Sequence, residues 1–205
     1  MLKTLRPRGY SLVEVLVTIA VVAVLVAAVA PSASELMANM RLRSASESML
    51  SGLQKARSEA VKSNQVVTFW MVSAATPTVL DNSCQLSSTS RSWVVSYDDP
   101  SSKCSSASST TVAPRIVQLS NAGSGGNDLS VTAAATDGSA ATQVSFDGFG
   151  RRPAAALAGD ISTIDFVSQT SGTRALRIQI SAAGNVKICD PHALVTVPPD
   201  PKACL

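Results

Sequence analysis

The sequence has few of the residues on which enzymes usually depend. Aromatic residues make up 4% of its 205 positions, charged residues make up 15%, and His192 is its single histidine. It contains neither an HExxH zinc motif nor a GxSxG nucleophile elbow, and the Gly123–Gly126 stretch lacks the Lys-Ser/Thr ending of a phosphate-binding loop. A lone histidine beside Pro191 is most simply a solvated loop residue. We therefore expect no catalytic residues and no cofactor.

Cysteine is scarce too, and its four copies all lie in the C-terminal two thirds of the chain: Cys84, Cys104, Cys189 and Cys204. The absence of a C-x-x-C pair argues against zinc. An even number of cysteines in loop-like surroundings indicates disulfides formed in an oxidising compartment. Three connectivities are possible, and the local pairing, Cys84–Cys104 with Cys189–Cys204, is the one we favour.

Acidic side chains form no obvious metal or catalytic site. Asp147 and Asp160 are candidates for a carboxylate pair, although nothing in their spacing requires one. Asp137-Gly138 and Asp147-Gly148 are typical of turns rather than of calcium loops. We expect no metal site.

Positive charge is concentrated at the start of the chain. The formal net charge is +3, but three basic residues, Lys3, Arg6 and Arg8, precede Gly9. A chain cut after Gly9 keeps 14 of the 17 basic residues against 14 acidic ones and is formally neutral. This weakens the simplest argument for binding to nucleic acid.

A long apolar run follows the basic leader. Tyr10 to Ala30 is 21 residues, enough for a helix to span a hydrocarbon core of about 30 Å. The leader should stay cytoplasmic, which places everything after Pro31 outside. Glu14 is the one charged residue in the run, and an unpaired charge there costs at least ~2.5 kcal/mol on insertion scales. Either Glu14 has a partner, or it lies near the membrane face and reaches water.

Helical periodicity resumes beyond Pro31, where we expect a kink rather than a stop. The spacing of Ala45, Met49, Leu53, Ala56 and Ala60 makes one apolar stripe. Lys55, Glu59 and Lys62 can pair on another face. These patterns predict a single helix over Tyr10–Ser63.

Short β-type runs replace this pattern after Asn64. The predicted strands are Gln65–Val72, Ser92–Tyr97, Arg115–Leu119, Leu129–Ala133, Gln143–Phe146, Thr163–Val167, Ala175–Ile180 and Val186–Cys189. Leu176, Ile178 and Ile180 alternate with polar residues, so one face of that strand should be buried. We expect an α+β fold with two antiparallel sheets against the helix, and an irregular tail, Pro191–Leu205, held by Cys204.

Two motifs resemble a known family. Gly9, an aromatic residue, Ser11-Leu12-Val13 and Glu14 at the head of an apolar helix resemble the prepilin motif of type IV pilins and type II secretion pseudopilins. The stretch from Ala56 to Asn64 resembles the helix end of the minor pilin and pseudopilin H family (GspH, FimT and FimU types). Tyr10 departs from the phenylalanine usual there. The resemblance implies a pilin-like fold: leader 1–9, transmembrane helix 10–30, amphipathic continuation 31–64 and periplasmic β-rich domain 65–205.

The resemblance also implies a non-enzymatic structural role. Prepilin peptidase would cleave after Gly9, and Tyr10 would become the methylated N-terminus in the cell inner membrane. Glu14 would neutralise the new α-amino group of a neighbouring subunit. The implied partners are membrane lipid, an inner-membrane assembly platform, and other minor and major pilins or pseudopilins. Both a type IV pilus and a type II secretion pseudopilus fit, and the Ser-rich loops and cysteine pairs favour the pilus.

DNA binding is an alternative, because some FimT-type minor pilins act in DNA uptake. The resemblance there would rest on a basic Gly-Arg-x-Arg stretch, where this chain has Gly184-Asn185-Val186-Lys187. Each phosphate contact adds to affinity, so the missing charge matters. A modest patch could still come from Arg174, Arg177 and Lys187, or from Arg151-Arg152, but we favour scattered solvated charges. An unrelated signal-anchored periplasmic binding domain is a third hypothesis.

Overall fold

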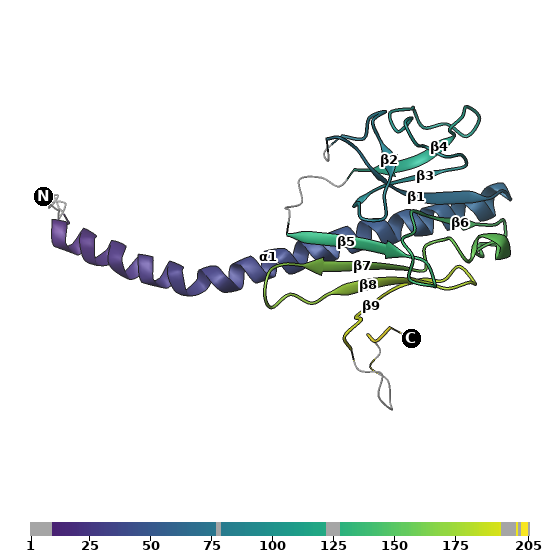
Figure 1. Cartoon of the computed structure of the whole chain (residues 1–205). Coiled ribbons are helices and arrows are strands. Elements are labelled where there is room, and N and C mark those ends of the chain that lie inside the picture. The colour runs from purple at the N-terminus through teal and green to yellow at the C-terminus, as the bar shows by residue number, and fades with distance from the viewer. Residues whose placement is uncertain (1–9, 77–78, 122–127, 194–199, 201, 205) are drawn as a thin grey trace, which may run out of the picture.

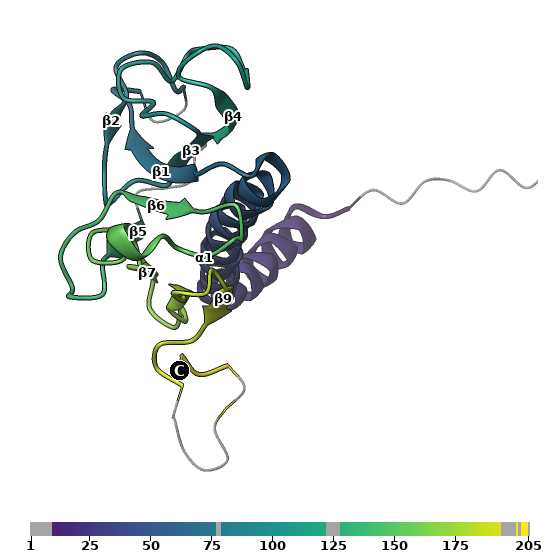
Figure 2. The ribbon, with the colours of Figure 1, turned by 90° about the vertical axis from the view of Figure 1, so that its right-hand side faces the viewer.

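One long helix and two antiparallel sheets make up the computed structural model, which describes residues 10–76, 79–121, 128–193, 200 and 202–204. The helix α1 (Leu12–Ser63) projects far beyond the β domain at its N-terminal end (Figure 1). Both sheets lie on one side of its C-terminal half, and the opposite side of α1 is open (Figure 2). The predicted α+β architecture, a long helix packed on antiparallel sheets, is confirmed.

Local signals define both ends of α1. Ser11 is the N-cap, and its side chain accepts a hydrogen bond from the backbone N–H of Glu14 at 3.2 Å. Asn64 ends the helix in the left-handed conformation. The helix continues through Pro31, and its axis curves between the free half and the packed half (Figure 1). The assignment of this curvature to Pro31 stays a prediction.

The first sheet has β1 (Val67–Ser73) at its centre. Its order is β2 (Gln85–Leu86), β1, β3 (Ser92–Ser96) and β4 (Ile116–Ser120), and β6 (Gln143–Phe146) also pairs with β1. The two-residue β2 was not expected from the sequence.

The second sheet runs in the order β5, β7, β8, β9. Its strands are β5 (Leu129–Ala134), β7 (Thr163–Ser168), β8 (Leu176–Ile180) and β9 (Val186–Cys189), and a 3-10 turn, η1 (Ala154–Ala156), precedes β7. All pairings are antiparallel, so the prediction of two antiparallel sheets is confirmed.

The main core lies between α1 and the inner faces of both sheets. Met49, Leu53, Ala56 and Ala60 of the predicted stripe are buried there, and Ala45 is half-buried. Gly52 lets the helix approach the first sheet closely, because a Cβ at this position would lie 2.8 Å from the ring of Phe69 and 2.9 Å from that of Trp93. The helix is therefore held by apolar burial along one complete face.

Two disulfides hold the irregular segments. Cys84 is bonded to Cys104 within a second, smaller apolar cluster, and Cys189 at the end of β9 is bonded to Cys204. This is the local pairing favoured from the sequence. Asp190 also forms an isolated parallel bridge with Ala203, so the tail returns to the second sheet.

Candidate assembly site on the N-terminal helix

The N-terminal half of α1 exposes an apolar surface of great length. Every residue from Tyr10 to Val26 is exposed, although almost all are apolar. Tyr10 is 82% exposed, Leu12 79% and Val24 70%. Apolar patches of this size on soluble proteins mark sites that another molecule or a membrane covers.

No helix among the described residues has the combined length and hydropathy of a membrane-spanning segment. The span predicted for 10–30 includes residues 27–30, whose side chains lie outside the described part of the chain. The leader 1–9, with Gly9, also lies outside it. The span, the cleavage site and the methylation of Tyr10 stay predictions.

Glu14 lies in the first turn of this apolar half. Its backbone N–H is bonded to Ser11, and a carboxylate at a helix N-terminus is favoured by the helix dipole. Within the described chain, the Glu14 carboxylate has neither a hydrogen-bond partner nor an ion-pair partner. The Ser-x-x-Glu spacing is an N-cap signal that could have been used to place the helix start from the sequence.

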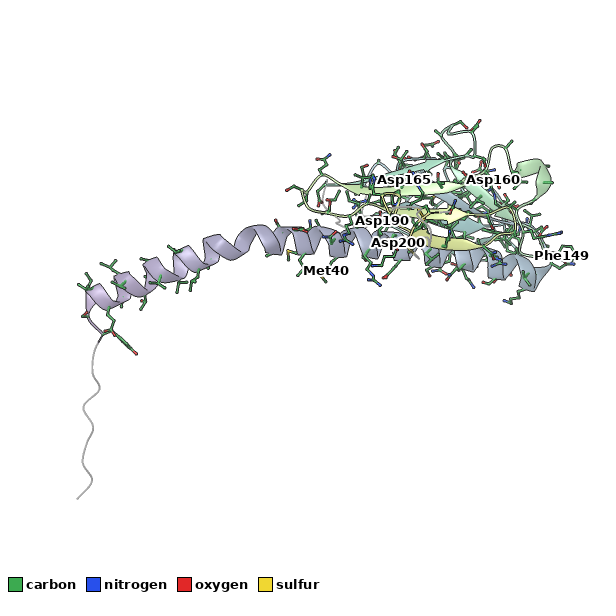
Figure 3. All side chains as sticks on the ribbon, turned by 90° about the horizontal axis from the view of Figure 1, so that it is seen from below. Met40, Phe149, Asp160, Asp165, Asp190 and Asp200 are labelled. Atoms are coloured by element: carbon green, nitrogen blue, oxygen red, sulfur yellow. A yellow bond between two sulfur atoms is a disulfide. The ribbon has the colours of Figure 1, made fainter. Side chains whose placement is uncertain are left out.

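Exposed apolar side chains occur again on α1 between residues 33 and 40. Leu36, Met37 and Met40 are 62%, 59% and 63% exposed, and Figure 3 shows Met40 on the open side of α1. One turn later, Arg43 and Glu47 form an exposed ion pair at 2.8 Å. The exposed apolar surface described on α1 therefore comprises residues 10–26 and, farther along the helix, Leu36, Met37 and Met40.

The C-terminal half of α1 contains a second carboxylate with quite different surroundings. The Glu59 side chain is 6% exposed and lies 3.4 Å from Lys55 Nζ and 3.6 Å from Lys62 Nζ. The hydroxyl of Tyr97 donates to it at 3.4 Å. The predicted pairing of Lys55, Glu59 and Lys62 is confirmed, and a buried carboxylate needs such partners.

The residues considered for DNA contact have different environments. Arg177 Nε and Nη2 donate to the two Asp165 carboxylate oxygens at 2.6 and 2.9 Å, which neutralises the charge and raises the pKa of Arg177. Lys187 is exposed on β9 opposite Gln179, and Arg174 is exposed just before β8. DNA contact by these residues stays a prediction.

Arg151 and Arg152 do not form a joint surface patch. Arg151 is exposed and pairs with Asp147 at 3.5 Å. Arg152 is 6% exposed and donates to the backbone carbonyls of Ile180, Leu157 and Asp160. Burial lowers its pKa. The interpretation of this dipeptide as a basic patch is therefore wrong, because Arg152 ties internal segments together.

Asp147 and Asp160 have separate partners. Asp147 Oδ1 accepts hydrogen bonds from the backbone N–H groups of Phe149 and Arg151, and the Arg151 bond contributes most to lowering its pKa. Asp160 is 2% exposed, accepts from Ser145 N at 2.8 Å, and has a pKa raised by burial. No group of three or more potential metal ligands occurs in the part of the chain that the structure covers, where His192 is exposed.

Comparisons with known proteins give two family matches. Residues 45–184 match the family described as type II transport protein GspH, and residues 5–30 match the prokaryotic N-terminal methylation motif. No curated protein matches the chain.

Two crystal structures of the type IV minor pilin FimU from Pseudomonas aeruginosa strain PAO1 are similar to the chain at 16% identity. In space group P21 the match covers 72% of this chain and 87% of that chain, with a TM-score of 0.42. In space group P65 the corresponding values are 71%, 90% and 0.38.

The GspH match covers more than half of the 205 residues, and the methylation motif covers the region of Gly9, Tyr10 and Glu14. The chain belongs to the GspH family, whose members are non-enzymatic, structural subunits of the pilin and pseudopilin type.

Proposed function

We propose that this chain is a minor pilin or pseudopilin that assembles into a type IV pilus or a type II secretion pseudopilus. Prepilin peptidase cleaves it after Gly9, and Tyr10 becomes the methylated N-terminus. The helix then anchors the subunit in the cell inner membrane with the β domain in the periplasm, until an assembly platform transfers it into the fibre.

The observation that carries this proposal is the exposure of the apolar side chains of residues 10–26, together with Leu36, Met37 and Met40 farther along α1. The C-terminal half of the same helix is covered by its own β domain, but the N-terminal half has no such cover. Lipid covers it before assembly, and the helices of neighbouring subunits cover it afterwards. The β domain remains at the periphery, where its loops are free to make contacts specific to this subunit.

Glu14 gives the apolar assembly a fixed register. Cleavage after Gly9 creates a positively charged α-amino group at Tyr10, and both charges are then enclosed by apolar helices. Each would be costly if it were unpaired, so contact between Glu14 of one subunit and Tyr10 of its neighbour is favoured over other axial positions.

The mass of the membrane-bound chain tests this proposal. We expect the intact protein to lack residues 1–9 and to have one methyl group on the Tyr10 α-amino group. A Gly9→Val variant should keep its leader, because a bulky side chain replaces the small residue before the cleaved bond. The matched control is Gly159→Ala, at an open surface position where a Cβ meets nothing within 4 Å. A wild-type chain that keeps its leader in the membrane would refute the proposal.

A further inference from the structure

An exposed aromatic side chain stands at the end of the molecule farthest from the N-terminus. Phe149 is 77% exposed and lies in the turn between β6 and η1, beside the C-terminal end of α1 (Figure 3). Burying a phenylalanine side chain stabilises a fold, so leaving one in water forgoes that stabilisation.

Hydrogen bonds on both sides of Phe149 fix the turn. Asp147 Oδ1 accepts from the N–H groups of Phe149 and Arg151, each at 2.9 Å. Asp147 N donates to Arg151 O, and Gly150 N donates to Asp147 O, each at 2.8 Å. The guanidinium of Arg151 lies over the Phe149 ring, 4.9 Å from its centroid. The ring is therefore held outward by a well-bonded turn.

Close packing against the C-terminal end of α1 also fixes this turn. A Cβ at Gly148 would overlap the side chain of Asn64, the residue that caps the helix. Gly150 has φ +71°, which favours glycine, and its carbonyl accepts a hydrogen bond from Arg57 Nε at 2.9 Å. The turn that presents Phe149 is therefore packed firmly against the C-terminal end of α1.

Further exposed apolar and cationic side chains lie on the helix end and strand next to this turn. Val61 would lie 3.1 Å from a Cβ at Gly150, and Val66 immediately precedes β1, whose Val67 pairs with Phe146. Val61 and Val66, on either side of the helix end, are 52% and 50% exposed. The side chains of Lys62 and Arg151 are 78% and 59% exposed, whereas their acidic partners Glu59 and Asp147 are 6% and 24% exposed. We call Val61, Lys62, Val66, Phe149 and Arg151 the distal patch. The charged groups of the distal patch that reach solvent are therefore cationic.

We propose that the distal patch is the docking site for a second, different subunit of the same fibre, and that this subunit presents an apolar pocket edged by carboxylates. The proposal rests on the proposed function, because parallel helices in a fibre place another subunit beyond this end. A rigid aromatic anchor with flanking cations suits such a pocket, since little side-chain freedom is lost on binding. An anionic lipid surface is the other partner that would match an exposed aromatic side chain flanked by cations. However, residue 61 lies about 45 Å along the helix from residue 30, far from the chain's own membrane.

Site-specific photo-cross-linking in cells tests the proposal. A photoreactive phenylalanine analogue replaces Phe149 in the full-length chain, and the matched control places it at Val112, another exposed apolar position at 69% exposure. We expect a cross-link at position 149 to one subunit that has its own N-terminal methylation motif, through a peptide containing Asp or Glu. The control position should give none.

Co-purification of that subunit with this chain gives a second measurement. Phe149→Ala should reduce the amount of the subunit recovered roughly thirtyfold, and Phe149→Leu should retain most of it. Arg151→Gln should have an intermediate effect.

Each outcome separates this proposal from the proposed function. Cross-links to lipid, to nucleic acid or to no partner above the Val112 level would overturn the distal patch as a docking site, as would full recovery of the partner with Phe149→Ala. If the chain is nevertheless processed after Gly9 and enters the fibre, the proposed function stands. A chain that keeps its leader and stays out of the fibre fails at the earlier step, whatever position 149 contacts.

Discussion

The two halves of α1 form one continuous helix but have opposite surroundings. In the C-terminal half, Leu53 is completely buried and Glu59 has three partners from its own chain. In the N-terminal half, Leu16 is 59% exposed and Glu14 has no side-chain partner among the described residues. Backbone hydrogen bonds and capping maintain the helix in both halves, so helix formation does not distinguish them.

The two halves of α1 are suited to being covered by different molecules or domains. Apolar residues in the C-terminal half recur every three to four positions and match a single domain face. Apolar residues in the N-terminal half occur all round the helix, which is typical of a helix surrounded by lipid or by several other helices. One half therefore stabilises the fold, and the other half leaves its described apolar side chains exposed.

The largest expected effect comes from truncating one leucine in each half. Leu53→Ala leaves a cavity between α1 and the sheets and should lower the free energy of unfolding by about 2–5 kcal/mol. Leu16→Ala, its matched control, should leave the unfolding of the β domain unchanged. Chemical denaturation of both full-length variants in detergent micelles, followed by tryptophan fluorescence, measures the difference. Equal losses of unfolding free energy in the two variants would show that both halves of α1 stabilise the fold.

A smaller effect is expected from neutralising the buried carboxylate of the packed half. Glu59→Gln keeps the shape of the side chain but removes the charge that Lys55 and Lys62 face, and should cost about 1–3 kcal/mol of unfolding free energy. Glu47→Gln is the control on the same helix, because the Arg43–Glu47 pair is exposed and such pairs contribute about 0–1 kcal/mol. In thermal unfolding, Glu59→Gln should lose more stability than Glu47→Gln. A larger loss for Glu47→Gln would contradict the role given to Glu59.

The sequence predicted the parts of the fold that depend on local pattern. The stripe from Ala45 to Ala60 predicted the packed helix face, and β-branched runs predicted every strand except β2, which is too short to show a period. The outward position of Phe149 could not be predicted, because it depends on Asn64 and Arg57, which are distant in the sequence. The burial of Arg152 was missed for a similar reason: this residue lies in the irregular segment before η1, and its acceptors include the carbonyl of Ile180 at the end of β8.

The smallest expected effect is a pH dependence of the β domain. Burial raises the pKa of Asp160, so the native state keeps a proton over a pH range in which the unfolded chain has lost it. Stability should therefore fall as the pH rises from the ordinary aspartate value through that range. Asp160→Asn should remove this dependence in thermal unfolding, and Leu16→Ala should retain it. An Asp160→Asn profile identical to that of the wild type would show that this carboxyl does not titrate in the folded state.

We expect Glu14 to act between subunits rather than within the fold, and the incorporation of a Glu14→Gln variant into fibres measures this. The variant should unfold like the wild type, reach the membrane and lose residues 1–9, yet be depleted at least tenfold from sheared fibres, because pairing with the Tyr10 α-amino group is lost. Glu47→Gln should incorporate normally. Wild-type incorporation of Glu14→Gln would contradict the account.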